Sequence, residues 1–256
     1  MRRRFFVEKF EHRSAVIRGE TAGHLGRVLR AEPGQLYELS DGNSVWLARV
    51  ERVETPKRGE SRIEFALVEP VAARESSLQI ALLLSLIKFD RFEWCLEKAV
   101  ELGAVEIVPL AAARTDKPLI AAAGRRRARW DKILVESSQQ ARRLRPPSLR
   151  MASEAGRVPG PHDAFEQSSA DLKLLLSERR EAAPLREALP ARVSPGQERE
   201  KPLFVSLAIG PEGGWTDEEL SSARAAGFAE VSLGENILRA ETAVISAMAI
   251  LRFILG

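Results

Sequence analysis

The chain has 256 residues, of which 45% are apolar and 29% are charged, and a net charge of +3, which is ordinary for a globular protein with one large or two modest domains. One cysteine excludes an internal disulfide framework, and three histidines without ligand spacing argue against a metal site. No apolar run reaches the roughly 18 residues of a membrane helix, and the basic N-terminus lacks the apolar segment of a signal peptide, so we expect a cytoplasmic protein with no membrane partner.

Residues 1–72 are predicted to form a small β-barrel. Short strands at FFVEKF, QLYELS, SVWLARVERV and RIEFALVEPV are separated by turn signals at 33–34, 41–43 and 57–59. A short helix is expected in ETAGHLGRVLRAEPG, between the first two of these strands. Residues 73–77 are the expected linker to a second domain.

Residues 78–256 alternate strands with helices, which is typical of a layered α/β domain. SLQIALLLSLI is a continuous apolar strand, suited to burial on both faces of a parallel sheet. Further strands are predicted at VEIVPL, DLKLLLSE, LFVSLAIG and EVSLG, and helices at RFEWCLEKAVELG, at 124–142 and from Asp217. A partly helical or mobile loop is expected at about 181–202. The last helix starts near Glu241, and its expected core stripe is Val244, Ala247, Ile250, Leu251 and Ile254.

The loop IGPEGGWTDEEL, residues 209–220, follows a buried strand and precedes a helix. Thr216 and Glu219 form a capping box, and the loop lies at the carboxyl end of a strand, where α/β proteins bind ligands. The loop contains no lysine, and its acidic helix start repels phosphate. S-adenosylmethionine fits this chemistry better than a nucleotide, because its adenosine carries no phosphate and its sulfonium is cationic. Alternatively, the glycines form a turn and nothing more.

A second loop, LGENILRAETA at 233–243, also joins a strand to a helix. Two such loops at adjacent strand ends are able to enclose one pocket. We therefore predict that the two loops share a ligand.

Arginine is concentrated in GRRRARWDKILVESSQQARRLR, residues 124–145. Such a cluster is typical either of a solvated helix face or of phosphate contacts with a nucleic acid. Charge alone does not decide between these two interpretations.

Several of these stretches together resemble the ribosomal RNA small subunit methyltransferase E family, a branch of the SPOUT class. They are IGPEGG, LGENILRAETA, EKAVELGAVEIVPL, the RW-KI-E-S-QQ-RR run and HLGRVLR at 24–30. The resemblance covers nearly the whole chain. It departs from the family pattern at 136–143, where Gln140 and Arg143 match but an acid and a serine are replaced, and at 112–115, where Arg114 is kept.

The resemblance implies a fold, a reaction and partners. The fold is an N-terminal PUA-like RNA-binding β-barrel at 1–72, followed by a SPOUT-type α/β domain with a deep trefoil knot at 78–256. The reaction is S-adenosylmethionine-dependent methylation of uridine N3 in 16S rRNA (uridine 1498 in the usual rRNA numbering) on the small ribosomal subunit. The enzyme is expected to be a homodimer.

Three groups of site residues follow from the loops and the resemblance. The cofactor-binding candidates offer backbone groups or apolar side chains: Leu176, Ile209, Gly210, Gly213, Gly214, Leu233, Gly234, Ile237, Leu238 and Ala243. The catalytic candidates are Arg239, for developing negative charge on the uracil, and Glu212 or Glu241 as the base. The alternative roles are a salt bridge of Arg239 to Glu235 or Glu241, and capping of backbone amides by the two glutamates. The RNA-binding candidates are His24, Arg27, Arg30, Arg114, Gln140 and Arg143.

Two other functions compete with this interpretation. An NAD-dependent dehydrogenase would need GxGxxG after its first strand, and that strand is followed here by KFDRFEW. A non-catalytic RNA-binding assembly factor, or a methylase that acts on another RNA site, stays open as an alternative.

Overall fold

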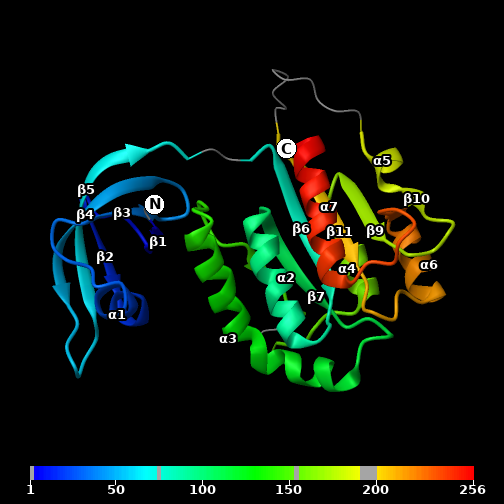
Figure 1. The fold of residues 1–256 in the computed structure, drawn as a ribbon, viewed down its shortest axis with the longest axis horizontal. Coiled ribbons are helices and arrows are strands. Elements are labelled where there is room, and N and C mark those ends of the chain that lie inside the picture. The colour runs from blue at the N-terminus through cyan, green and yellow to red at the C-terminus, as the bar shows by residue number, and fades with distance from the viewer. Residues whose placement is uncertain (1–2, 74–75, 153–155, 191–200) are drawn as a thin grey trace. The chain divides into compact units, whose positions relative to one another are not determined.

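The protein, described by a computed structural model for residues 3–73, 76–152, 156–190 and 201–256, consists of two compact units (Figure 1). Unit 1 comprises Met1–Glu75 and Ser138–Pro146, and unit 2 comprises Ser76–Ser137 and Pro147–Gly256. The sequence pattern did not indicate that residues 138–146 belong to unit 1. Part of the expected linker (74–75) and part of the expected loop (191–200) lie outside the described residues.

Unit 1 is built on a five-stranded sheet with the order β1-β3-β4-β5-β2, which forms a half-barrel. Its elements are β1 (Arg4–Phe6), β2 (Ser14–Arg18), α1 (Gly19–Arg27), β3 (Leu36–Ser40), β4 (Val45–Glu54) and β5 (Arg62–Val71). The four predicted strands are confirmed, although β1 is shorter than predicted, and β2 is an additional strand. The core consists of the inward side chains of the sheet, including Phe5, Leu39 and Phe65, together with Leu25 from α1.

A buried ion cluster joins the segment 138–146 to the sheet within unit 1. Glu38 on β3 is 4% exposed and accepts hydrogen bonds from Arg4 at 2.8 and 3.1 Å and from both Nε and Nη2 of Arg142. Arg4 also donates to the Arg142 carbonyl at 2.6 Å, and Ser40 Oγ donates to the Leu144 carbonyl at 2.6 Å. Arg142, from the arginine-rich stretch, therefore has a structural role.

Unit 2 contains a seven-stranded parallel sheet with the order β10-β12-β9-β11-β6-β7-β8. Its strands are β6 (Leu78–Ser85), β7 (Ala104–Leu110), β8 (Ser148–Leu149), β9 (Leu172–Leu176), β10 (Ala183–Pro184), β11 (Leu203–Ile209) and β12 (Ala229–Ser232). The five strands predicted from apolar runs are confirmed, whereas the two-residue strands β8 and β10 are too short to leave a pattern.

Helices cover both faces of this sheet. They are α2 (Phe89–Glu101), α3 (Lys117–Gln140), α4 (Pro161–Glu166), α5 (Leu185–Ala188), α6 (Asp217–Ala225) and α7 (Ala240–Leu255). On β6, the residues 78, 80, 82 and 84 face the core beneath α2, α3 and α7, whereas 81 and 83 face α4 and α6. The expected burial of this strand on both faces is therefore confirmed.

The core stripe of α7 differs from the prediction. The buried side chains are Ala240, Ala243, Val244, Ala247, Met248, Leu251 and Leu255. Ile254 is partly buried and packs against the core, as predicted, whereas Ile250 is 36% exposed, so the predicted stripe was wrong at that position. Hydrophobicity marked Ile250 for burial, but it lies on the outer side of the helix. In the described part of the chain, no helix combines the length and apolar character needed to span a membrane.

We predict that Glu38→Ala destabilises unit 1 by about 3 kcal/mol, because it leaves two arginines without their buried partner. Chemical denaturation followed by circular dichroism measures this loss. The matched control is Glu51→Ala, which removes an exposed partner of Arg49 on the same sheet and should cost less than about 1 kcal/mol. Equal, small losses for the two variants would show that the cluster does not hold unit 1 together.

Candidate active site

A pocket of about 350 Å³ lies where β9, β11 and β12 end in unit 2. These strands are neighbours in the sheet, and Leu176 on β9 pairs with Ile209 of β11 on one side and with Val231 of β12 on the other. All three strands are parallel, so the loops that follow them leave the sheet at the same edge. The pocket is lined by the segments 176–178, 209–215 and 233–240 and by Ala243.

The structure brings together all ten cofactor-binding candidates. Leu176, Ile209, Gly210, Gly213, Gly214, Leu233, Gly234, Ile237, Leu238 and Ala243 all line the pocket. Seven further residues line the pocket: Ser177, Glu178, Pro211, Trp215, Glu235, Asn236 and Ala240. Five of them lie in the two predicted loops, whereas Ser177 and Glu178 belong to a third loop that was not predicted. All seven are close in sequence to predicted candidates. This proximity could have identified them, because a loop that lines a pocket with its backbone also places neighbouring residues there.

The Trp215 side chain packs against the backbone of the glycine loop. Its side chain is buried, and its Nε1 donates a hydrogen bond of 2.9 Å to the Leu176 carbonyl at the end of β9. A Cβ on Gly210 would lie 3.1 Å from the indole ring, so glycine allows the loop to pass over the tryptophan. The turn closes through a hydrogen bond of 2.9 Å from Gly214 N to the Pro211 carbonyl. The loop is thereby held against the neighbouring strand.

Two side chains attach the glycine loop to the loop after β7. Glu219 completes the predicted capping box with Thr216, and its other carboxylate oxygen accepts a hydrogen bond of 2.7 Å from Ala113 N. Arg114 donates to the Gly213 carbonyl at 2.7 Å, and its aliphatic part lies against Gly213. Arg114, predicted to contact RNA, is thus placed beside the pocket and supports its wall.

The three catalytic candidates differ in whether they line the pocket. Arg239 and Glu212 line the pocket, whereas Glu241 does not. Arg91 on α2 lies 4.0 Å from Glu212 and 3.9 Å from Glu241, so one guanidinium serves both carboxylates. Within the described residues, the Arg239 side chain has neither an ion pair nor a hydrogen bond, so the alternative salt bridge to Glu235 or Glu241 is not formed.

Cys95, the one cysteine of the chain, is fully buried behind the site. Burial, with a smaller contribution from the Glu241 carboxylate, raises the pKa of the Cys95 thiol to about 12. The thiol is therefore protonated at neutral pH and is not a nucleophile.

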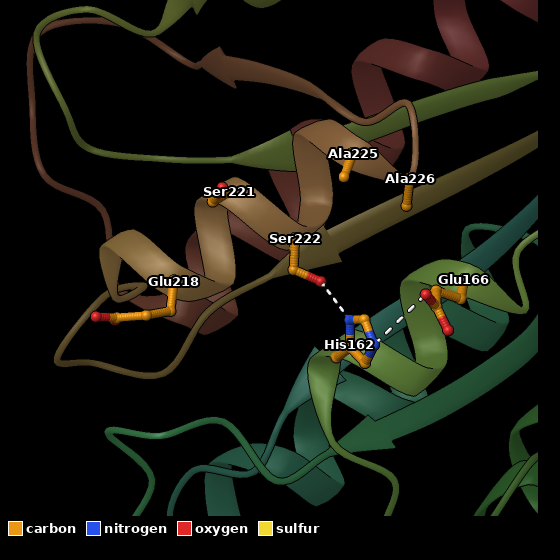
Figure 2. A pocket seen from close by; sticks show the side chains of 7 residues that line it. All are labelled: His162, Glu166, Glu218, Ser221, Ser222, Ala225 and Ala226. Atoms are coloured by element: carbon orange, nitrogen blue, oxygen red, sulfur yellow. Dashed lines mark hydrogen bonds and ion pairs between the residues drawn. The ribbon is translucent and has the colours of Figure 1, made fainter.

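A second hollow, of about 710 Å³, lies between α4 and α6 (Figure 2). His162 Nδ1 lies 2.8 Å from Ser222 Oγ, and His162 Nε2 lies 3.4 Å from Glu166. The His162 and Glu166 side chains are 66% and 64% exposed, so water competes for their contacts. Ser222, His162 and Glu166 therefore do not form a preorganised nucleophile and base. The described ranges contain no group of three His, Cys, Asp or Glu residues suited to a metal ion.

The remaining RNA-binding candidates lie in unit 1. His24 and Arg27 are exposed on α1, with Arg27 Nη2 3.4 Å from Ser61 Oγ, and Arg30 follows the helix with a positive φ of 52°. Gln140 is exposed and Arg143 is partly buried in the segment 138–146. These positions stay predictions of RNA contact.

Comparison with known proteins identifies the class. Residues 74–252 match the RNA methyltransferase domain. Ribosomal RNA small subunit methyltransferase E of Synechocystis sp. is 33% identical over 232 residues, which cover 88% of this chain and 68% of that protein. The same enzyme of Mesomycoplasma hyopneumoniae is 27% identical over 244 residues, with coverage of 94% and 95%.

The fold agrees with this match. The structure of the Neisseria gonorrhoeae ribosomal RNA small subunit methyltransferase E, bound to S-adenosyl methionine, has a TM-score of 0.81 at 28% identity and covers 100% of this chain and 99% of that chain. The two units are thus a PUA-like unit and a SPOUT-type α/β unit, as expected, and the deep knot stays a prediction. The chain belongs to the ribosomal RNA small subunit methyltransferase E family.

We predict that Trp215→Phe destabilises unit 2 by about 1–3 kcal/mol, because the Leu176 carbonyl loses its buried donor. Urea denaturation monitored by circular dichroism tests this. The control is Trp94→Phe, at a tryptophan that is 41% exposed, which should leave the denaturation midpoint close to that of the wild type. If both variants unfold together with the wild type, the indole hydrogen bond does not secure the glycine loop.

Proposed function

We propose that this protein transfers the methyl group of S-adenosylmethionine to N3 of a uridine in 16S rRNA of the small ribosomal subunit. Family membership supports methylation of small-subunit rRNA with this cofactor. The main support from this chain is the pocket formed by three loops. Its lining combines glycine backbone, apolar side chains and Arg239, which has no partner among the described residues. We also propose that the reaction takes place in the cytoplasm, where its rRNA substrate would be found.

The pocket residues suit an adenosine without phosphate. Lys and Arg side chains that would hold a polyphosphate are absent from its described lining apart from Arg239, whereas three glutamates contribute negative charge. Backbone donors and acceptors of the glycine loop are available to the adenine edge, and Leu176, Ile209 and Leu238 are available to enclose the ring. When bound, the cofactor supplies an electrophilic methyl group on a cationic sulfur.

Methylation of N3 requires loss of the N3 proton and stabilisation of the charge that develops on the uracil oxygens. We assign the second task to Arg239, because a guanidinium stays charged and offers a fork of donors. Arg239 is the N-cap residue of α7, so its backbone is fixed while its side chain is uncommitted. We retain Glu212 as the candidate proton acceptor, since it lines the pocket, and assign Glu241 to holding Arg91.

We propose that RNA binding involves the exposed basic residues of unit 1. We retain the boundaries 1–72, 73–77 and 78–256 for barrel, linker and catalytic domain, except that the segment 138–146 belongs to unit 1. Arg27 and Arg30 on and after α1 are exposed, as phosphate contacts require. The slope of the logarithm of affinity for small subunits against the logarithm of salt concentration measures the number of such contacts.

The reaction is tested by mass mapping of 16S rRNA from a strain that lacks the enzyme, before and after incubation of its small subunits with the purified protein. Appearance of a single N3-methyluridine supports the proposal. A methyl group elsewhere in the RNA would favour a methylase with a different site, and no methyl transfer with intact RNA binding would favour the assembly factor.

Arg239→Ala is expected to lower the methyl-transfer rate by about 10²–10³-fold, as for loss of one donor to a developing oxyanion. Cofactor affinity in calorimetry should stay within a few-fold of the wild type, because Arg239 acts on the uracil. Arg180→Ala, at an exposed arginine outside the pocket lining, is the control. An equal loss of cofactor binding and of rate would assign Arg239 to the cofactor.

We also propose a homodimer that uses the outer face of α7. Ile250 and Phe253 are 36% and 72% exposed and lie three residues apart on one helix face. The double change Ile250→Glu and Phe253→Glu should convert the dimer to a monomer in size-exclusion chromatography with light scattering. Val68→Glu, at an exposed valine of unit 1, should leave the dimer unchanged; a dimer that survives the α7 changes would refute this interface.

A further inference from the structure

Glu178 is a carboxylate of the pocket that the fold leaves without a partner. It follows β9 directly and lines the pocket together with Leu176 and Ser177. Within the described chain it has neither a hydrogen bond nor an ion pair. An ionised carboxylate accepts several hydrogen bonds. Both carboxylate oxygens of Glu178 are therefore available to accept hydrogen bonds from a ligand in the pocket.

The backbone around Glu178 is held firmly. Ser177 N donates to the Val231 carbonyl of β12 at 2.9 Å, and Arg179 N donates to Ser177 Oγ at 3.2 Å. On the opposite side, the carboxylate lies against Gly214, where an ideal Cβ would come within 3.1 Å of Glu178 Cδ. Gly214 has a φ of +69°, so both conformation and space favour glycine there.

Neighbouring cations do not neutralise Glu178. The guanidinium of Arg179, the next residue, is paired with Asp217 at 2.9 Å and lies 3.8 Å from Glu181. Arg114 donates to the Gly213 carbonyl, and Arg91 lies between Glu212 and Glu241. Glu212 thus has a cation within 4.0 Å, whereas no described residue forms an ion pair with Glu178.

We propose that Glu178 is a specificity-determining residue that favours the cationic cofactor over its neutral product. This inference rests on the proposed function. Methyl transfer turns the sulfonium of S-adenosylmethionine into the neutral thioether of S-adenosylhomocysteine. A carboxylate whose backbone is held beside the pocket attracts the sulfonium through its charge and gains nothing comparable from the thioether, while it loses water in both cases. Glu178 therefore promotes release of the product and binding of the next cofactor.

The test is isothermal titration calorimetry of the full-length protein with three ligands: S-adenosylmethionine, S-adenosylhomocysteine, and sinefungin, in which an amine-bearing carbon replaces the sulfonium. Glu178→Gln keeps the size of the side chain and removes its charge. It should weaken the two cationic ligands about fivefold, as expected for a partly exposed ion pair, and leave S-adenosylhomocysteine unchanged. In turnover, the same variant should become more sensitive to inhibition by S-adenosylhomocysteine.

Glu181→Gln is the matched control, since Glu181 is 79% exposed, lies three residues further along and does not line the pocket. Equal weakening of all three ligands by Glu178→Gln would overturn the proposal, because it would assign the carboxylate to groups that cofactor and product share, such as the ribose hydroxyls. Unchanged affinities of Glu178→Gln for all three ligands would show that Glu178 does not contact them, which would also overturn the proposal. If the wild-type protein binds none of the three ligands, the proposed function fails instead.

Discussion

The site depends on the parallel pairing of β9 with both β11 and β12. Leu176 is opposite Ile209 on one side and Val231 on the other, so three strands end at the same level. Three loops that are far apart in the chain therefore meet at one edge of the sheet. The hydrogen bond from Trp215 to the Leu176 carbonyl then fixes the glycine loop across this junction. A shift of one residue in either pairing would separate the walls of the pocket.

The charges around the pocket fall into two groups. Arg91, Arg114 and Arg179 are committed to carboxylates or to a carbonyl of the surrounding loops. Arg239, Glu178 and Glu235 are not committed among the described residues, and all three line the pocket. Unpaired charges contribute little to stability, so their retention at a concave site points to interactions with a ligand. Arg239 is suited to the anion that forms on the substrate, and Glu178 to the cation on the cofactor.

Local patterns were sufficient to predict five of the seven strands of the parallel sheet, the Thr216 capping box and two of the three loops of the pocket. Each of these is encoded by residues close together in the chain. Two features were beyond such reasoning. The ion cluster joins Glu38 to Arg142 across 104 positions, and Glu178 meets Gly214 only because β9 and β11 are adjacent. The exposure of Ile250 was missed because hydrophobicity alone does not distinguish a core stripe from an exposed apolar position on the same helix.

The arginine-rich stretch has structural roles within the protein that its charge alone did not indicate. Arg126 and Arg129 pair with Glu93 on α2, and Arg142 pairs with Glu38 on β3. Glu93 and Glu38 are both far from the stretch in sequence. The acidic residues within the stretch itself therefore gave no indication of these pairs. Each of these arginines uses part of its guanidinium donors on a buried glutamate, and removal of the arginine would leave that carboxylate uncompensated. We therefore propose phosphate contacts first for exposed basic residues without an acidic partner among the described residues, such as Arg27 and Arg30, while the pairs of Arg126, Arg129 and Arg142 hold the protein's own elements together.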